Sequence, residues 1–203
     1  NIDLIQCHDA SERQWLPPAS YSLLQQIDNR GVFSFCMCPG GIIVPSATGP
    51  NQVVVNGMSN ADRSSPFANS GIVVSVKQED ISAYKKHGIF AGLKYQEELE
   101  YMAFKAGGET QTAPAQRMLD FVNAKFSNSL PKTSYIPGVK SAPLHELLPT
   151  ALSQRLAEAF QTFGNKMKGY YTDEAILLGV ESRTSSPIRI PRDRISMEHI
   201  QIK

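Results

Sequence analysis

Apolar and polar side chains alternate along the first half of the chain, a pattern typical of half-buried β-strands. In the run from Gly31 to Cys38, successive side chains are expected to point to opposite faces of a strand. We expect the large side chains to form the core face: Phe33, Phe35 and Met37. The opposite face would be small enough for a flat ligand or another backbone to approach closely, and it would carry Val32, Ser34, Cys36 and Cys38.

Four other segments of the first half have strand patterns, namely 21–27, 42–44, 52–56 and 71–76. Asp28-Asn29-Arg30-Gly31 predicts a hairpin turn in which Gly31 takes positive φ. Pro39-Gly40-Gly41 predicts a tight corner that ends the strand before it. A long polar loop over 57–70 joins the last two strands, and loops of that length are often functional.

Apolar residues in the second half are spaced by three and four, which predicts helices. The first helix follows Tyr95, Leu99, Met102 and Ala106 and ends at Gly107-Gly108. A second is expected from Thr112 to Phe126, and a third from Leu152 to Met167, with Gly169 as its stop. We expect 127–149, with its four prolines, to be a connector, and 175–181 and 188–190 to be strands.

Strands, then helices, then a returning strand pair predict an α+β fold, with a mixed, mostly antiparallel sheet covered by about three helices. We expect 1–20 to be a lead-in segment, 21–90 mainly strands, 91–170 mainly helices and 171–203 the returning strands. The returning strands would rejoin the first sheet. The helices would cover one face of it.

Composition narrows the class of protein. Twenty basic against nineteen acidic residues give a formal net charge of +1, so no basic surface for nucleic acid is predicted. No apolar run approaches the roughly 18 residues that cross a bilayer, and the N-terminal residues are too polar for a secretory signal. Three cysteines are too few, and an odd number, for a disulfide framework. We therefore expect a cytoplasmic protein without membrane or nucleic-acid partners.

Three interpretations of Cys36-x-Cys38 remain open from the residues alone. The two thiols could form a redox pair or contact a flavin, although two extended residues separate Cα atoms by roughly 6.6 Å, near the limit for a disulfide. They could join Cys7 and His8 as zinc ligands. They could also be small side chains that fill a tight strand interface.

Charged residues give weaker signals. Arginines cluster near the end of the chain, where they could hold an anion or line a solvated strand edge: Arg183, Arg189, Arg192 and Arg194. Glu97-Glu98-x-Glu100 is expected to form a solvated helix face. The sequence contains no G-x-G-x-x-G and no P-loop motif, so it has no dinucleotide fingerprint of its own.

Three segments together resemble a bacterial family of uncharacterised FAD-dependent dehydrogenases, long flavoproteins with a two-dinucleotide-type fold: 31–76, 148–175 and 181–193. The most specific part is Phe-Cys-Met-Cys-Pro-Gly-Gly joined to Val-Asn-Gly-Met-Ser. In that family the FAD-binding segments flank such a region. The resemblance, and a start at Asn1 rather than Met, imply a middle, substrate-side or cap domain excised from a longer flavoprotein.

The resemblance implies a hydride transfer between an organic substrate and FAD, which would be held mainly by the flanking FAD-binding domain, so that the isolated domain is inactive. Cys36 and Cys38 match the cysteine corner of the family and become candidate catalytic groups, with Pro39, Gly40 and Gly41 beside the cofactor. Arg183, Ser185 and Arg189 become candidate substrate-binding residues. The alternative is a non-catalytic binding or structural module, stabilised by zinc.

Overall fold

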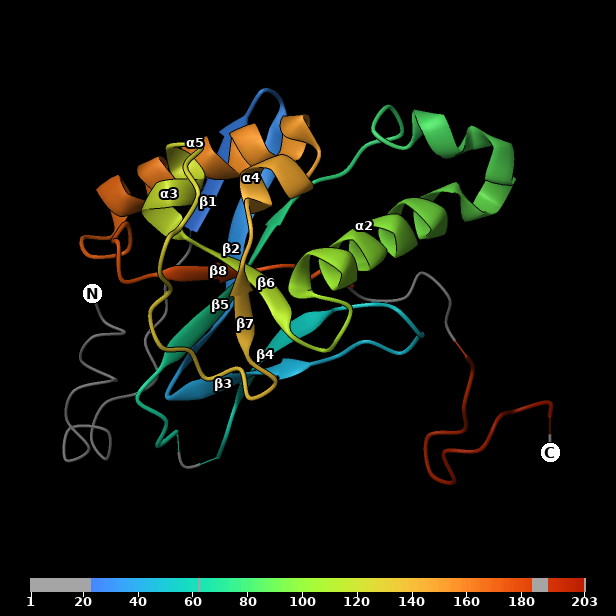
Figure 1. The fold of residues 1–203 in the computed structure, drawn as a ribbon. Helices are drawn as coiled ribbons and strands as arrows, with labels where there is room; N and C mark the ends of the chain where they lie inside the picture. Colours follow the sequence, from blue (N-terminus) through green and yellow to red (C-terminus); the bar gives the residue numbers. More distant parts are fainter. Residues whose placement is uncertain (1–22, 62, 184–189, 203) are drawn as a thin grey trace.

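The structure is a computed structural model, and it describes residues 23–61, 63–183 and 190–202. The chain has an α+β fold, as the sequence predicts (Figure 1). The first half contains five strands, β1 (Leu23–Ile27), β2 (Arg30–Pro39), β3 (Gly41–Pro45), β4 (Val55–Ser59) and β5 (Ala68–Val74). The expected lead-in segment and residues 188–189 of the last expected strand lie outside the described residues.

The second half alternates helices with short strands. It consists of η2 (Ser82–Phe90), α2 (Ala91–Gly107), β6 (Ala113–Arg117), α3 (Met118–Val122), β7 (Val139–Ser141), α4 (Leu144–Leu147), α5 (Thr150–Lys166) and β8 (Ile176–Leu178). Gly108, in the left-handed conformation, ends α2 where the sequence predicts a stop. Among the described residues, none of the helices has the length and apolar character needed to cross a membrane.

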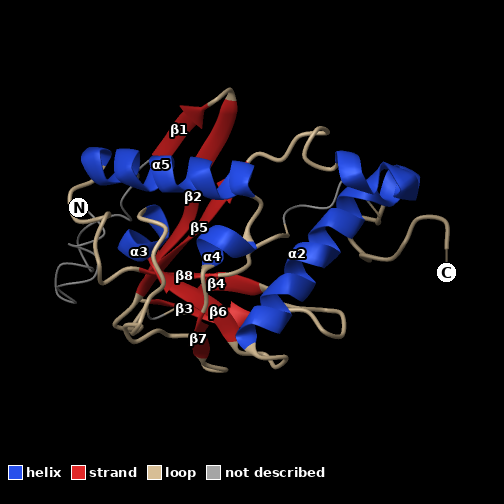
Figure 2. Cartoon of the chain, turned by 45° about the horizontal axis from the view of Figure 1, so that its top comes forward, coloured by secondary structure: helices blue, strands red, loops and turns tan. Residues whose placement is uncertain are grey.

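The strands form three small sheets, in the orders β1-β2-β5, β3-β4 and β7-β6-β8. All pairs are antiparallel except β6 with β7. The expectation that the last strand rejoins the first sheet is wrong, because β8 pairs with β6 instead. Figure 2 shows α5 across one face of the β1-β2-β5 sheet. The short helices α3 and α4 lie between α5 and the β7-β6-β8 sheet in this view.

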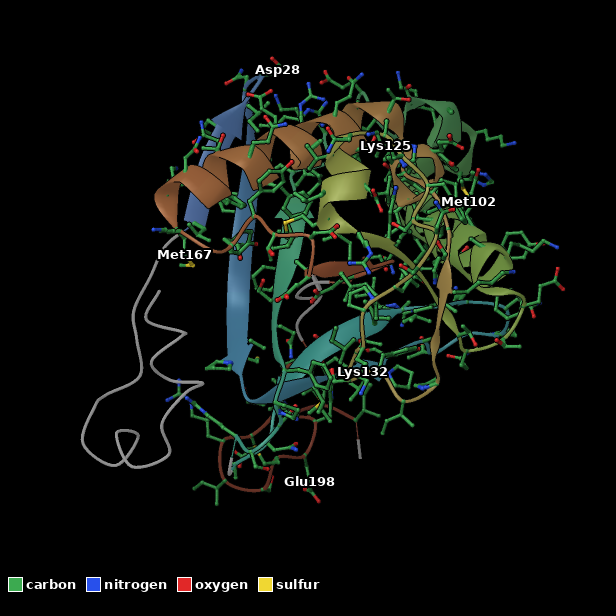
Figure 3. The ribbon with its side chains drawn as sticks, turned by 60° about the vertical axis from the view of Figure 1, so that its left-hand side comes forward. Asp28, Met102, Lys125, Lys132, Met167 and Glu198 are labelled. Atoms are coloured by element: carbon green, nitrogen blue, oxygen red, sulfur yellow. The ribbon has the colours of Figure 1, made fainter. Side chains whose placement is uncertain are left out.

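The β1–β2 hairpin closes through Asp28 and Asn29, which have positive φ values of 45° and 61°. Ile27 pairs with Arg30, so only these two residues form the turn. Positive φ at both central residues is the geometry of a type I′ turn, which follows the twist of the strands. The prediction that Gly31 supplies the positive φ is therefore wrong; Asp28 lies at the tip of the hairpin (Figure 3).

The two faces of β2 are the reverse of those predicted. Val32 is fully buried and Ser34 is 8% exposed, and Val32 belongs to a core cluster with Ala159 and Phe163 of α5. Phe33 and Phe35 lie on the other face and remain 37% and 38% exposed. Alternation fixes which residues share a face, but not which face α5 covers, and side-chain size alone suggested the wrong one.

The segment 113–117 is a strand, not the start of the expected helix. Its first four residues are all buried, as is usual for a central strand with neighbours on both sides. The buried Gln116 side chain donates to Lys125 O at 2.7 Å, and its Oε1 accepts from His145 N–H at 3.2 Å. The helix expected from 112 to 126 is therefore only the short α3.

Candidate functional site

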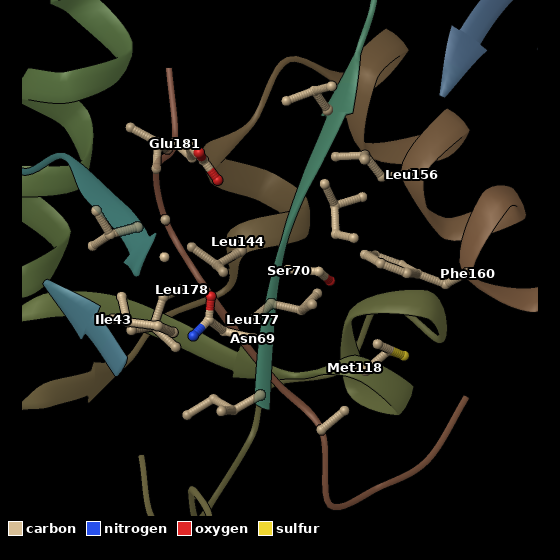
Figure 4. Close-up of a pocket in the computed structure, with 18 of the residues that line it drawn as sticks. Ile43, Asn69, Ser70, Met118, Leu144, Leu156, Phe160, Leu177, Leu178 and Glu181 are labelled. Carbon is tan, nitrogen blue, oxygen red and sulfur yellow. The ribbon is translucent and has the colours of Figure 1, made fainter. Parts of the chain in front are cut away.

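A cavity of about 880 Å³ surrounds β5 and is lined mainly by apolar side chains. Those drawn in Figure 4 come from several elements, including Ile43 of β3, Leu144 of α4, Phe160 of α5 and Leu178 of β8. Polar side chains, among them Asn69, Glu181 and Arg183, interrupt this lining at several points. Small-molecule sites in proteins are commonly apolar hollows of this size with a few placed polar groups.

Of the side chains labelled in Figure 4, Asn69 and Glu181 are the polar ones on one side of β5, whereas Ser70 lies on the other side with Leu156 and Phe160. Asn69 and Gly71 are two residues apart on β5 and therefore share a face, at positions about 7 Å apart. Glu181 approaches this same face at Gly71. We refer to Asn69 and Glu181 as the polar wall of the cavity.

The Glu181 carboxylate occupies space that the missing side chain of Gly71 leaves open. A Cβ at Gly71 would lie 2.6 Å from Glu181 Oε2 and 2.8 Å from the Phe35 ring. No hydrogen bond or ion pair links this carboxylate to another described residue. Burial raises the pKa of Glu181 above its ordinary value, because an apolar surrounding disfavours the charged form.

Glu181 is held from both sides along the chain. On one side, Val180 O accepts a hydrogen bond from Val55 N–H of β4 at 3.0 Å, and Val180 is buried. On the other side, Ser182 Oγ donates to Glu100 Oε1 at 2.6 Å. The backbone at Glu181 is therefore fixed between β4 and α2.

Asn69 joins three strands. Its Nδ2 donates to Ile42 O of β3 at 3.3 Å. Its Oδ1 lies so close to Gly57 of β4 that a Cβ there would be only 2.0 Å from it. Asn69 Oδ1 is buried and has no hydrogen-bond partner among the described residues. A buried acceptor without a partner is uncommon, and functional sites are one place where it occurs.

The Pro39-Gly40-Gly41 corner is closely packed. Gly40 has a φ of +64°, and a Cβ there would lie 1.9 Å from Arg63 O. Gly41 N–H donates to Phe67 O at 3.1 Å, so it is engaged within the chain. Both glycines are therefore required by the turn and its close contacts. The expected contact of this corner with a cofactor remains a prediction.

A β-bulge lies between Phe35 and Cys38 of β2, because Phe35 pairs with Gly71 and Cys38 with Asn69. Three residues of β2 thus span two of β5. This bulge interrupts the regular backbone register predicted for 31–38, and the structure does not describe the Cys36 side chain. Cys38 is partly exposed, and a Cβ on Gly41 would be 2.8 Å from the Cys38 Cβ. Because Cys38 pairs with Asn69, it lies beside the Asn69 end of the cavity.

Arg183 forms an ion pair with Glu100, which is fully buried. Arg183 Nε donates to Oε1 at 3.0 Å and Nη2 to Oε2 at 2.8 Å. Gln96 Nε2 also donates to Glu100, at 2.8 Å. The prediction that Glu100 belongs to a solvated face is wrong. The guanidinium group that was expected to bind substrate is occupied by this carboxylate.

Several of the remaining predicted site residues cannot be placed relative to the cavity. Ser185 and Arg189 lie outside the described residues, as do Cys7 and His8 of the zinc interpretation. Within 23–61, 63–183 and 190–202, no three His, Cys, Asp or Glu side chains gather as metal ligands. Arg192 and Arg194 are exposed, and Arg192 forms an isolated bridge with His199.

The described residues form a small α+β domain with a mainly apolar cavity at β5. The family "FAD-dependent protein, C-terminal domain-like" matches residues 1–184, and the chain belongs to this family. It is therefore a domain associated with flavoproteins. A relative from Clostridium beijerinckii, described as an uncharacterized protein, is 40% identical over 191 residues, which cover 92% of this chain and 35% of the relative.

The chain thus spans about a third of the length of the relative that it matches. The family description refers to a C-terminal domain, whereas the sequence resemblance predicted a middle domain, and the position of this segment in a longer chain stays a prediction. Sequence reasoning did not identify Asn69 or Glu181 as site residues. Asn69 follows the long polar loop, and Glu181 opens the last of the three family-like segments, but neither carries a motif.

Proposed function

We propose that this domain is the substrate-side part of a FAD-dependent oxidoreductase, in which a hydride passes between an organic substrate and the flavin. The cavity around β5 carries this proposal. Its volume of about 880 Å³ suits a small organic molecule, and its mainly apolar lining would exclude water from the reacting atoms. Membership of a FAD-dependent family supports the choice of cofactor.

The residues fit a role beside the flavin better than a role in holding the whole dinucleotide. A mainly apolar cavity of this volume suits a ring or an apolar substrate. The sequence lacks the glycine-rich fingerprint that places a pyrophosphate at a helix N-terminus. When bound, FAD supplies the hydride chemistry. The residues of this domain would bind the substrate, orient it and keep water away.

Cys38 pairs with Asn69, which lines the cavity, and this pairing supports its candidacy. We retain it, with Cys36, as a candidate redox relay or proton donor. For Arg183 we favour a positioning role, because its guanidinium group is engaged by Glu100 and fixes the chain beside Glu181. A direct contact with an anionic substrate would require this ion pair to open.

The test uses the full-length protein. We expect it to be purified with bound flavin, and we expect apolar alcohols or amines to bleach the flavin absorbance anaerobically. Leu178→Trp, which fills the cavity, should keep the flavin and lose substrate reduction. Ile89→Trp is the matched control, because the Ile89 side chain is 94% exposed and a larger side chain there should not disturb the core. Absence of flavin, or full reduction with Leu178→Trp, would contradict the proposal.

The cysteines are tested separately. Cys38→Ser and Cys36→Ser in the full-length protein should slow flavin reduction while leaving flavin content unchanged. Full retention of the reduction rate in both variants would assign the thiols to packing.

A further inference from the structure

We propose that one face of the β1-β2-β5 sheet is the docking surface for the remaining part of the full-length chain, the part that would hold FAD. We call it the open face, and it is defined by Leu24, Phe33, Phe35 and Val73. It lies opposite α5, which covers the other face (Figure 2). This inference rests on the proposed function and names the surface through which the two parts would meet.

The strand register places apolar side chains in one row across the open face. Leu24 pairs with Phe33, and Phe33 pairs with Val73, so all three point to the same side of the sheet. Phe35 lies two residues further along β2 and therefore shares this side. Leu24, Phe33 and Phe35 are 41%, 37% and 38% exposed, although leucine and phenylalanine are among the residues most often buried. The described residues thus leave a continuous apolar strip uncovered.

Two glycines let the phenyl rings lie against the sheet. A Cβ on Gly31 would be 2.5 Å from Cζ of Phe33, and a Cβ on Gly71 would be 2.8 Å from the Phe35 ring. Each ring therefore fills the space of a missing side chain on the same face. A glycine inside a strand often marks a place where another part of the protein approaches closely. The rings form a low apolar surface on which a second packed surface can lie.

The open face carries no charge among the described residues of its three strands. Besides the apolar row, its members are Gln26, Gly31 and Gly71. The face of an antiparallel sheet that stays in water is normally polar. A contiguous apolar strip on a surface instead marks a site of interaction. The composition of this face is therefore that of a surface covered in the intact protein.

The length of the related chain indicates what covers it. The relative from Clostridium beijerinckii is matched over only 35% of its length, so most of that protein lies outside the matched segment. Permanent interfaces are more hydrophobic than transient ones, and a cover within the same polypeptide is permanent. Phe33 and Phe35 also line the cavity. A part of the chain that docks on the open face would therefore bring the flavin beside the proposed substrate site.

The first experiment places a photoreactive side chain on the open face of the full-length protein. Benzoylphenylalanine replaces Phe33 in one sample and Phe126 in the control, since Phe126 is 54% exposed and follows α3 outside the sheet. After irradiation, the products are separated by mass and their crosslinked peptides are sequenced. We expect position 33 to crosslink to peptides outside residues 1–203 in a product of monomer mass. Position 126 should give a lower yield of such crosslinks.

The second experiment needs no substitution. Hydroxyl radicals oxidise exposed phenylalanine rings in the native full-length protein, and mass spectrometry measures the rate at each ring. Phe163 is fully buried and Phe126 is exposed, so these two rings set the ends of the scale. We expect Phe33 and Phe35 to be oxidised at a rate near that of Phe163. A rate nearer to that of Phe126 would show that the open face stays in solvent, which would overturn the inference.

Other crosslinking results would also overturn it. A product of dimer mass would assign the open face to a second copy of the chain, and crosslinks to the flavin alone would assign it to the cofactor. Crosslinks only within 1–203, no crosslink, or equal yields from positions 33 and 126 would remove the docking role.

Flavin content and flavin reduction are measured on the unsubstituted protein. A protein that gives the expected crosslinks but holds no flavin would contradict the proposed oxidoreductase function alone. A flavoprotein that is reduced by substrate while Phe33 is oxidised as an exposed ring would contradict the docking surface alone.

Discussion

Arg183 and Glu100 meet through two hydrogen bonds, Nε to Oε1 at 3.0 Å and Nη2 to Oε2 at 2.8 Å, with the carboxylate fully buried. A two-pronged pair of this kind fixes geometry as well as charge. It ties the chain after β8 to the middle of α2. Because Glu181 is only two residues away, the pair also sets the position of the polar wall of the cavity.

Arg183→Ala should lower the free energy of unfolding by about 3 kcal/mol, because it leaves the buried Glu100 without its charge partner. The matched control is Lys94→Ala. Lys94 pairs with Glu97 on the surface of the same helix, with exposed fractions of 44% and 37%, and its loss should change stability by less than about 1 kcal/mol. Chemical denaturation measures both. Equal losses in the free energy of unfolding would show that the buried Arg183–Glu100 pair stabilises the fold no more than a surface pair does.

The same pair predicts acid sensitivity. Burial would raise the pKa of Glu100, but hydrogen bonds from Arg183, Ser182 and Gln96 and the charge of Arg183 outweigh it, so its pKa lies below the ordinary 4.5. The stabilisation is therefore complete above about pH 4.5 and is lost as the pH falls through the lower folded value. Denaturation from pH 7 into this acid range should show the loss in the wild type and a flatter profile in Arg183→Ala.

Ionisation of Glu181 should have the opposite effect on the stability of the fold. Its folded pKa is raised by burial, so the folded protein binds this proton more tightly than the unfolded chain does. Ionisation above the ordinary value of 4.5 then favours unfolding. We expect Glu181→Gln to gain stability relative to the wild type as the pH rises above about 4.5, and to lose this gain in acid. A stability difference that does not vary with pH would refute the assignment.

Gly40→Ala should destabilise the domain by about 3 kcal/mol or more, since it adds a clash with Arg63 O to the strain of positive φ. Gly108→Ala separates the two effects. Gly108 is also left-handed, at φ 97° and ψ 30°, but its nearest neighbour would be Lys140 Nζ at 3.5 Å. Its substitution should cost about 1–2 kcal/mol. Similar losses of stability for the two variants in thermal melts would mean that the backbone around Gly40 can move to relieve the clash.

Local signals in the sequence predicted much of the fold. The amphipathic spacing from Leu152 to Met167 corresponds to α5, and the glycines at 107 and 108 mark the end of α2. These features depend only on neighbours along the chain. Positive φ at Asp28 and Asn29 was missed because Gly31 is the more obvious turn residue, although Asp and Asn also tolerate this conformation.

Features that depend on distant residues could not be predicted. Nothing near β8 in the sequence says that it pairs with β6, and nothing near Glu100 says that Arg183 lies opposite. The strand at 113–117 carries Pro114 and small residues, and only its two neighbouring strands make it a central strand. The candidate site shares this limit, since Asn69 and Glu181 line the same cavity only through the arrangement of β5 and the segment after β8.

The bulge in β2 has a consequence for how the chain tolerates change. It shifts the register of β2 against β5 by one residue. Val32 can then pack against α5 while Gly40 lies against Arg63 O. Removing one residue at 36 or 37 would restore strict alternation, and it would pull the corner about 3.4 Å along the strand away from its contacts. The length of this short stretch is therefore constrained independently of its thiols.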